Sequence, residues 1–505
     1  MPDETATSLL SRLAARNGLT TALGFCQDNL LRAQAVTDGD PTAISRLAEL
    51  AGVDPNPLFM NTFPRTSDGA QHLGKERIMS RWMARTRLRV CPACLLRDAS
   101  TSSLLPDAAM YGRTWWEIVF IQTCPLHSLP LVDLAAEKST IHDFAASIRP
   151  YAPSLNRLVA NTEPRDATAL ESYLIRRVRG QTGEVPLLDE VQAAVANRFC
   201  EVLGTVRLYG PSRRSHKLNQ AQLRTAGAAG FGMATEGEDA IRIFMSDLVR
   251  DGTANGPVNG GALSALGALY AWFSDARRSS DQERLCSMVR DVVSANMPMK
   301  ADAVLLGATI RERHLHSIRT ASIETGVHPK RLRKLLHAGG YIGDDHVGRP
   351  DNLVTFPADP CAPFLAELSG TKGLTKVAVY INAPRVQAQL LFQAGYLRPV
   401  YPRGESSKRL LAFNVKEVDA LMSSLMEGAE GIDHEVEGAF SIPRAAKRVP
   451  CGAMDIVRLI QDRRVPWVGR CLNEDGYLSI RIKPDQVRPM VFRGIGISVH
   501  QAAQD

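Results

Sequence analysis

The sequence predicts a mainly α-helical protein of several domains. Three observations predict this fold class: the length of the chain, apolar residues that recur at helical spacing, and an internal repeat in the last two-fifths. At 505 residues the chain is too long for one ordinary hydrophobic core, so about two to four domains are expected. The composition, with 45% hydrophobic and 22% charged residues, is typical of a globular protein.

The N-terminal part of the chain predicts short helices. Asp40 is a favourable N-cap with Pro41 at the first helical position, which predicts a helix from there. Residues 44–53 have the pattern of a small helix-turn-helix, a pattern that plain helical packing would explain equally well. An apolar stripe at helical spacing marks an earlier helix, formed by Leu9, Leu10, Leu13 and Ala14.

Two short motifs combine cysteine, histidine and proline. Cys91-Pro92-Ala93-Cys94 is followed by Cys124-Pro125-Leu126-His127. Each pair of ligands fits within one tight turn, and the prolines help to fix those turns. Zn²⁺ binds four such ligands in a closed tetrahedron, which leaves no position for water or substrate. The sequence therefore predicts one structural zinc site at Cys91, Cys94, Cys124 and His127, and two coincidental motifs without a metal are the alternative.

The residues around these motifs resemble the TniQ family, which includes TnsD. The resemblance extends over Leu95-Leu96-Arg97, Tyr111-Gly112-Arg113 and Trp115-Trp116, and it covers residues 1–135, about a quarter of the chain. Members of this family select target sites for bacterial transposons. In such families the N-terminal part engages the transposition machinery, typically an AAA+ regulator that recruits the transposase. The resemblance implies the same partners here, and we expect the two tryptophans to pack beside the zinc site.

The sequence shows no feature of a membrane or secreted protein. No run of eighteen apolar residues appears, so no membrane span is predicted. Met1-Pro2-Asp3-Glu4 has no apolar signal core, which indicates the cytoplasm and, with the family resemblance, the bacterial nucleoid. The cysteines outside the two motifs are expected to be free thiols.

The positive charge is concentrated at the C-terminal end. The formal net charge is +7, and residues 313–505 carry 26 Lys and Arg against 20 Asp and Glu, a net charge of +6. A basic surface attracts nucleic-acid phosphates because binding releases counterions. An ordinary solvated face would give the same charge.

The same region contains an internal repeat. Residues 320–342 align with residues 375–397 without a gap at an offset of 55, and residues 444–466 match less well at an offset of 124. Each copy predicts a helix, a tight turn and a second helix. Short apolar segments that resemble strands of a small wing follow the copies at residues 353–356, 410–413 and 477–480. The sequence therefore predicts tandem winged helix-turn-helix-like repeats.

A helix-turn-helix places the start of its second helix in the major groove of double-stranded DNA, so basic and polar residues are expected there. Arg can bind guanine through two hydrogen bonds, Asn and Gln suit adenine, and Lys mostly contacts phosphate. The candidate DNA-binding residues are His328, Lys330, Arg331, Arg333 and Lys334 in the first copy, Asn382, Arg385, Gln387 and Gln389 in the second, and Arg444, Lys447, Arg448 and Arg458 in the third. Helical hairpins that serve packing or protein contact are the alternative.

We do not expect an enzyme. The phosphate-binding loop of ATPases, the His-Glu-x-x-His motif and the Gly-x-Ser-x-Gly motif are all absent from the sequence. Residues 138–312 predict mostly helices and carry no functional motif.

The sequence thus predicts three regions: a TniQ-like domain with a zinc-binding module at residues 1–137, a helical middle region at 138–312, and three DNA-binding repeats at 313–505. The expected function is sequence-specific selection of a transposon target site, with recruitment of an AAA+ regulator and transposase. Two alternatives are an adaptor that couples an RNA-guided CRISPR effector complex to transposition, and a zinc-containing transcriptional regulator.

Overall fold

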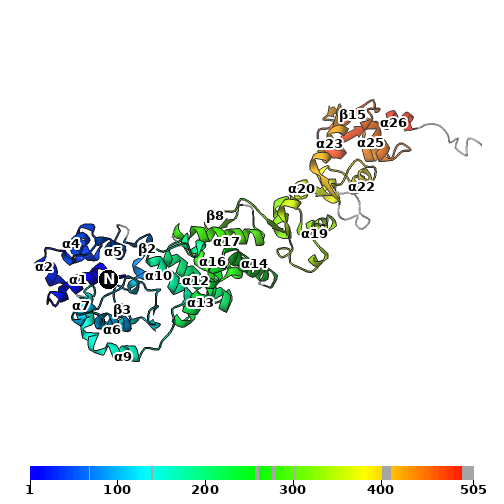
Figure 1. Ribbon diagram of the computed structural model, residues 1–505. Helices are drawn as coiled ribbons and strands as arrows, with labels where there is room; N and C mark the ends of the chain where they lie inside the picture. The colour runs from blue at the N-terminus through cyan, green and yellow to red at the C-terminus, as the bar shows by residue number, and fades with distance from the viewer. Residues whose placement is uncertain are drawn as a thin grey trace, which may run out of the picture. The chain divides into compact units, whose positions relative to one another are not determined.

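The computed structural model describes residues 1–66, 69–137, 140–255, 261–275, 280–300, 302–400 and 411–491. These residues are mainly helical, with short strands in small sheets (Figure 1). The chain forms two compact units: residues 1–296 with 304–309, and residues 297–303 with 310–505. The mainly helical, multidomain fold class is therefore confirmed. None of the helices in the described ranges has the length and apolar character needed to cross a membrane.

The first unit begins with a group of short helices around one core. They are α1 (Ala6–Arg16), α2 (Ala22–Asp28), α3 (Ala33–Thr37), α4 (Pro41–Ala51) and α5 (Pro55–Met60). As predicted, Asp40 caps α4: its carboxylate accepts a hydrogen bond of 2.8 Å from the Ala43 amide. Gly52, in the left-handed conformation, ends α4 before the short α5. Leu10 and Leu13 of α1 pack with Ile44 of α4 in the core.

Three two-stranded antiparallel sheets follow. The strands are β1 (Gln71–Leu73) with β2 (Glu76–Ile78), β3 (Leu88–Val90) with β6 (Val132–Leu134), and β4 (Thr123–Cys124) with β5 (Leu129–Pro130). The helices between them are η1 (Ser80–Trp82), α6 (Pro92–Ser100), α7 (Pro106–Ala109) and η2 (Thr114–Glu117).

The rest of the first unit is helical except for the hairpin β7 (Val304–Leu305) and β8 (Ala308–Thr309). The helices are α8 (Phe144–Ile148), η3 (Arg149–Ser154), α9 (Leu155–Ala160), α10 (Ala169–Val178), α11 (Pro186–Asp189), α12 (Ala193–Tyr209), η4 (Ser215–Lys217), α13 (Gln220–Thr235), α14 (Glu238–Asn255), α15 (Ala262–Leu266), α16 (Ala268–Phe273), η5 (Ser280–Gln282) and α17 (Glu283–Asn296). Helices α8 and α9 pack against α1 and α6, so this unit continues past residue 137. The predicted domain boundaries stay predictions.

Helices α12 and α13 approach each other closely because glycines lie at their contact. A Cβ atom on Gly204 would lie 1.7 Å from the Ala226 carbonyl oxygen. A Cβ atom on Gly230 would lie 2.0 Å from the Cys200 carbonyl oxygen. No side chain fits at either position without moving backbone.

The second unit contains the same order of elements three times: strand, helix, turn, helix, strand, helix. The first copy consists of β9 (Leu315–Ser317), α18 (Ile318–Thr325), α19 (Pro329–Ala338), η6 (Asp344–His346), β10 (Thr355–Pro357) and α20 (Ala358–Leu368). The second consists of β11 (Thr371–Gly373), α21 (Leu374–Tyr380), α22 (Arg385–Gln393), β12 (Ala412–Asn414) and α23 (Val415–Met426). The third consists of β14 (Phe440–Ser441), α24 (Ile442–Ala445), α25 (Ala453–Gln461), η7 (Gly476–Ser479), β16 (Ile480–Ile482) and α26 (Pro484–Val491), with β13 (Glu430–Ile432) and β15 (Val468–Cys471) added to its sheet.

In each copy the strand before the first helix pairs antiparallel with the strand after the second helix. The pairs are β9 with β10, β11 with β12, and β14 with β16. In the third copy β15 lies beside β16, and β13 lies parallel to β15. We call these three copies the first, second and third repeat. The interpretation as winged helix-turn-helix domains stays a prediction.

The third predicted wing segment is not a strand over most of its length, which corrects the sequence prediction. Residues 477–479 belong to the 3₁₀ helix η7, and only Ile480 belongs to β16. Gly476 has a φ of +67°, and the Ser479 hydroxyl donates to the Gly476 carbonyl, so this segment turns tightly. In the second wing segment Leu410 lies outside the described residues.

Two hydrophobic cores hold the repeats. The core of the first repeat is formed by α18, α19 and α20, and it includes Ala412 of the second repeat. The second and third repeats share one core, in which Leu391 of α22 and Ile456 of α25 are fully buried.

Candidate metal centre and nucleic-acid interface

The structure brings the four predicted metal ligands together. The ligand atoms of Cys91, Cys94, Cys124 and His127 lie within 4.8 Å of one another. The Cys94 and Cys124 sulfurs are 3.6 Å apart, and His127 Nδ1 lies 3.2–3.6 Å from all three sulfurs. A Zn²⁺ ion with Zn–S bonds of about 2.3 Å sets tetrahedral sulfurs about 3.8 Å apart. The four side chains therefore fit one metal ion of that size.

Local backbone structure explains how the ligands meet. Cys91 follows strand β3 and is the N-cap residue of α6, and Cys94 lies in the first turn of that helix. Pro92 at the first helical position starts α6 directly after Cys91. Cys124 ends β4, and the turn to β5 presents His127, with Ser128 in a positive-φ conformation. All three cysteines are fully buried, which suits a structural site.

The thiols of the cluster share protons unequally. Side-chain hydrogen bonds from Cys91 and Cys94 hold the pKa of Cys124 far below its usual value, to about 2. Hydrogen bonding to Cys124 raises the pKa of Cys94. A bound cation favours the thiolate form of each cysteine ligand.

A buried ion pair lies close to the metal centre, and two buried tryptophans lie beside that ion pair. Arg113 binds Asp98 of α6 through two hydrogen bonds of 2.8 and 3.1 Å, and its guanidinium lies 4.8 Å from the Trp116 ring centroid. Trp115 and Trp116 are buried and meet edge to face at 5.7 Å. Both tryptophans are thus buried in the protein, and their packing beside the zinc site stays a prediction.

Comparison with protein families now identifies this region. The TniQ family model matches residues 1–131. Residues 1–131 therefore match the TniQ domain, and we call them the TniQ domain. The predicted resemblance is thereby confirmed for this part of the chain, and a TniQ domain indicates a transposition-associated, DNA-binding protein. A comparison with curated proteins gives no match.

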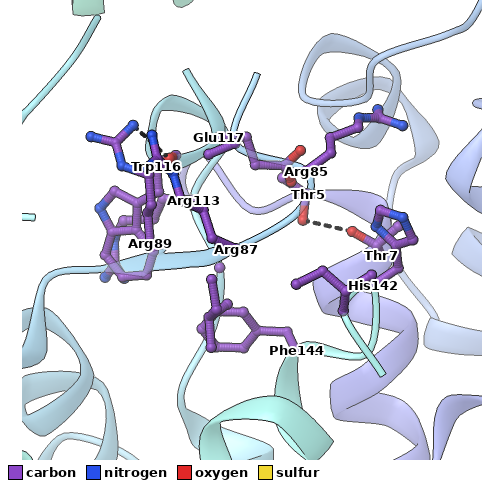
Figure 2. A pocket seen from close by; sticks show the side chains of 14 residues that line it. Thr5, Thr7, Arg85, Arg87, Arg89, Arg113, Trp116, Glu117, His142 and Phe144 are labelled. Atoms are coloured by element: carbon purple, nitrogen blue, oxygen red, sulfur yellow. Dashed lines mark hydrogen bonds between the residues drawn. The ribbon is translucent and has the colours of Figure 1, made fainter. Parts of the chain in front are cut away.

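Residues of the TniQ domain and of the segment that follows it line a small polar cavity of about 50 Å³ (Figure 2). Thr5, Thr7, Arg85, Glu117 and His142 lie on one side of it, and the hydroxyls of the two threonines are 3.2 Å apart. Burial raises the pKa of Glu117. The Arg85 Nε is buried and has no hydrogen-bond partner in the described part of the chain. A cavity of this size has room for a few water molecules.

In the first repeat the structure separates the predicted DNA-binding residues into two groups. Lys330 and Lys334 are exposed and lie one turn apart on α19, and their ammonium groups are free within the described residues. His328 is the exposed N-cap residue of that helix, where Nδ1 accepts from the Lys330 amide. Arg331 and Arg333 are half-buried and bind within the protein.

Arg333 holds the loop that follows α19. Its guanidinium donates to the carbonyls of His346 and Arg349 and forms an ion pair of 2.5 Å with Asp351. These bonds occupy the Arg333 guanidinium, which is the group that would contact DNA. Arg331 donates to the Leu411 carbonyl of the second repeat at 2.8 Å.

In the second repeat Arg385 and Gln389 are exposed on α22, at positions that align with Lys330 and Lys334. Asn382 has a φ of +47° in the turn, and its amide donates to the Asp475 carbonyl. Gln387 is half-buried and accepts from the Tyr477 hydroxyl at 3.3 Å. Both thus connect the second repeat to the third.

In the third repeat the predicted residues are all exposed but lie on different elements. Arg444 belongs to α24, and Lys447 and Arg448 belong to the turn that follows. Arg448 stacks over the Phe440 ring at 3.7 Å. Arg458 lies on α25, at the position that aligns with Lys334, and is 3.8 Å from Asp462.

Residues of the first two repeats meet in one groove of about 690 Å³, which we call the repeat groove. The predicted residues in its wall are His328, Arg331, Arg385 and Gln389. Lys376 of α21 also lines the groove, and it was not among the predicted residues because in the second repeat only the turn and the second helix were considered. A search of first-helix positions for basic residues would have found Lys376.

Proposed function

We propose that the protein selects a transposon target site by binding a specific sequence of double-stranded DNA. In this proposal the repeats bind the DNA, and the TniQ domain engages an AAA+ regulator that recruits the transposase. The protein itself neither cuts nor joins DNA. A structural Zn²⁺ at the metal centre maintains the fold of the TniQ domain.

One observation carries the proposal: a TniQ domain is followed by three repeats whose second helices expose basic or amide side chains at aligned positions. Lys334, Gln389 and Arg458 occupy the same position of α19, α22 and α25, and all three are exposed. Exposed cations of this kind bind DNA phosphates, and Gln and Arg can hydrogen-bond base edges. Three modules together can contact a long site, since each module buries only several hundred Å² on DNA.

A selection of genomic fragments on the full-length protein tests this function. The selection is made at about 150 mM salt, because binding to DNA of any sequence is weakened there. Recovery of one sharp site supports an autonomous target selector. If no fragment is enriched, sequence-specific binding by the repeats is wrong, and the adaptor on an RNA-guided complex takes its place.

A transposition assay then separates a target selector from a transcriptional regulator. The selected site is placed on a plasmid, and a transposase and an AAA+ regulator from the same genome are supplied together with this protein. We expect insertion close to the site only when the protein is present. Specific binding without directed insertion would favour the regulator.

A further inference from the structure

The repeat groove lies between the turn and second helix of the first repeat and both helices of the second. The first repeat contributes His328 and Arg331, and the second contributes Lys376, Arg385 and Gln389. Lys376 and Arg385 are exposed, and neither forms an ion pair in the described part of the chain. Residues from two repeats that the sequence treats as separate therefore share one concave surface.

The charge of this groove favours a polyanion. Arg331, Lys376 and Arg385 carry positive charge, and no carboxylate is found among the described residues that line the groove. Gln389 adds a donor and an acceptor. Phosphates of a DNA backbone are bound by such closely placed cations, with release of counterions. DNA is the polyanion that the proposed function supplies.

Arg331 has a different role from the other cations of the groove. Its Nη2 donates to the Leu411 carbonyl at 2.8 Å, and burial lowers its pKa. A Cβ atom on Gly373 would lie 3.4 Å from Arg331 Nη1, so the guanidinium packs directly against β11. The side chain is thus held against the second repeat and cannot reach a base edge from this position.

The two repeats are also joined by their core. Ala412, the first residue of β12, is fully buried in the core of the first repeat, and α20 packs against β12. Together with the bond from Arg331, this contact sets the distance between α19 and α22. The two second helices are therefore presented in one fixed arrangement.

We propose that the first and second repeats bind one DNA duplex as a single body, with the sugar-phosphate backbone in the repeat groove and Arg331 as the positioning residue that fixes their spacing. This inference rests on the proposed function, because it requires DNA binding. It adds that the DNA segments contacted by α19 and α22 have one allowed separation.

Spacing variants of the selected site test the fixed arrangement. Affinity is measured for the full-length protein on the native site and on sites with 1, 2 or 5 base pairs inserted between the two segments that these repeats protect. We expect the 5-base-pair insertion, about half a helical turn, to weaken binding about tenfold or more. Arg331→Ala should reduce that loss to about threefold or less, because the repeats can then adjust independently.

Lys416→Ala is the matched control for the loss of one positive charge. Lys416 is exposed at the start of α23 and does not line the groove. This variant should keep the full spacing preference. Lys376→Ala and Arg385→Ala should each lower the slope of log affinity against log salt by about 1, as expected for a lost phosphate contact.

The outcomes separate this inference from the proposed function. Tight binding of the wild-type protein to all spacings overturns the single-body arrangement and leaves target selection intact. Unchanged salt slopes for both Lys376→Ala and Arg385→Ala overturn the groove as a phosphate site. Neither measurement depends on the folding of the Arg331 variant. Failure of the wild-type protein to bind any DNA overturns both proposals.

Discussion

At the scale of residues, the metal centre depends on four side chains from two segments. Cys91 and Cys94 come from the start of α6, and Cys124 and His127 come from the β4–β5 hairpin. Neither segment is long enough to fold alone, so a metal ion that binds both contributes directly to the stability of the TniQ domain.

Cys94→Ser should release the metal and destabilise this domain. A serine hydroxyl is a poor zinc ligand, and the substitution would leave two buried thiols close to a half-buried imidazole. We expect zinc content to fall from about one ion per chain to near zero, and the unfolding free energy to fall by about 3 kcal/mol or more. Metal analysis by mass spectrometry and thermal melting check this. Cys26→Ser, at a buried thiol outside the cluster, should keep its zinc; unchanged zinc in Cys94→Ser would exclude this site.

His316 makes the stability of the first repeat depend on pH. The imidazole is buried, it is stacked on Phe356 with 5.7 Å between ring centroids, and it lies beside Arg313 and Glu324. Burial and then the charge of Arg313 lower its pKa below 6.5. The unfolded chain therefore binds the proton more readily than the folded chain, so stability present above pH 6.5 is lost as pH falls toward the folded pKa.

The test compares wild type with His316→Gln, which cannot titrate. We expect the stability advantage of wild type to shrink between pH 7.5 and 5.5, as measured by hydrogen exchange of the α18 amides. A difference that stays constant over this range would contradict the lowered pKa.

At the scale of elements, packing decides the role of residues that look alike in the sequence. Arg333 and Lys334 are adjacent basic residues of α19, yet Arg333 holds the following loop and Lys334 faces solvent. In the second repeat, the position that aligns with Arg333 is the buried Ala388. This position of the second helix faces the interior in both repeats. Arg333 is therefore kept off the exposed face of α19 by its position and not by its residue type.

The α12–α13 contact gives a prediction with a control on the same helix. Gly230→Ala would place a methyl group 2.0 Å from the Cys200 carbonyl oxygen, so the two helices must separate. We expect a loss of about 2 kcal/mol or more in unfolding free energy. Gly232→Ala meets no atom within 4 Å and should stabilise α13 by up to about 1 kcal/mol. Equal melting temperatures for the two variants would contradict the close contact.

The exposed lysines of α19 give a prediction for DNA binding. Lys330→Ala should weaken binding to all DNA sequences similarly and lower the salt slope by about 1, because the proposed function assigns this exposed lysine to a phosphate contact. Fluorescence anisotropy over a range of salt concentrations measures both effects. A change in preference between sequences would instead assign Lys330 to a base.

At the scale of the whole molecule, the proposed function assigns recruitment of the AAA+ regulator to the first unit and DNA binding to the second. The TniQ domain belongs to the first unit and the repeats belong to the second. Loss of the metal centre should therefore affect recruitment more than DNA binding.

Cys94→Ser should keep the affinity of the full-length protein for its DNA site within about threefold, provided that the repeats fold independently of the TniQ domain. The same variant should lose directed insertion in the transposition assay. If Cys94→Ser lost both DNA affinity and directed insertion, the metal centre would support DNA binding as well. That result would contradict the assignment of recruitment to the TniQ domain and of DNA binding to the repeats.

The sequence by itself determined the four residues that gather in the candidate metal centre, the TniQ resemblance and the order of helices in the repeats. These features depend on short-range patterns: cysteine spacing, an N-cap at Asp40, and apolar positions at helical intervals. Such patterns act within one element, so no tertiary contact is needed to find them.

Only the tertiary structure decided which of the basic side chains in the repeats face solvent and which are bound within the protein. Arg331 is bound to a carbonyl 80 residues away, Arg333 to a loop carbonyl and carboxylate, and Lys376 lies beside residues of another repeat. These contacts join segments that no sequence period relates. The physical reason is that a guanidinium looks the same in the sequence whether it faces solvent or a buried carbonyl, and only the packing of one repeat against the next distinguishes the two.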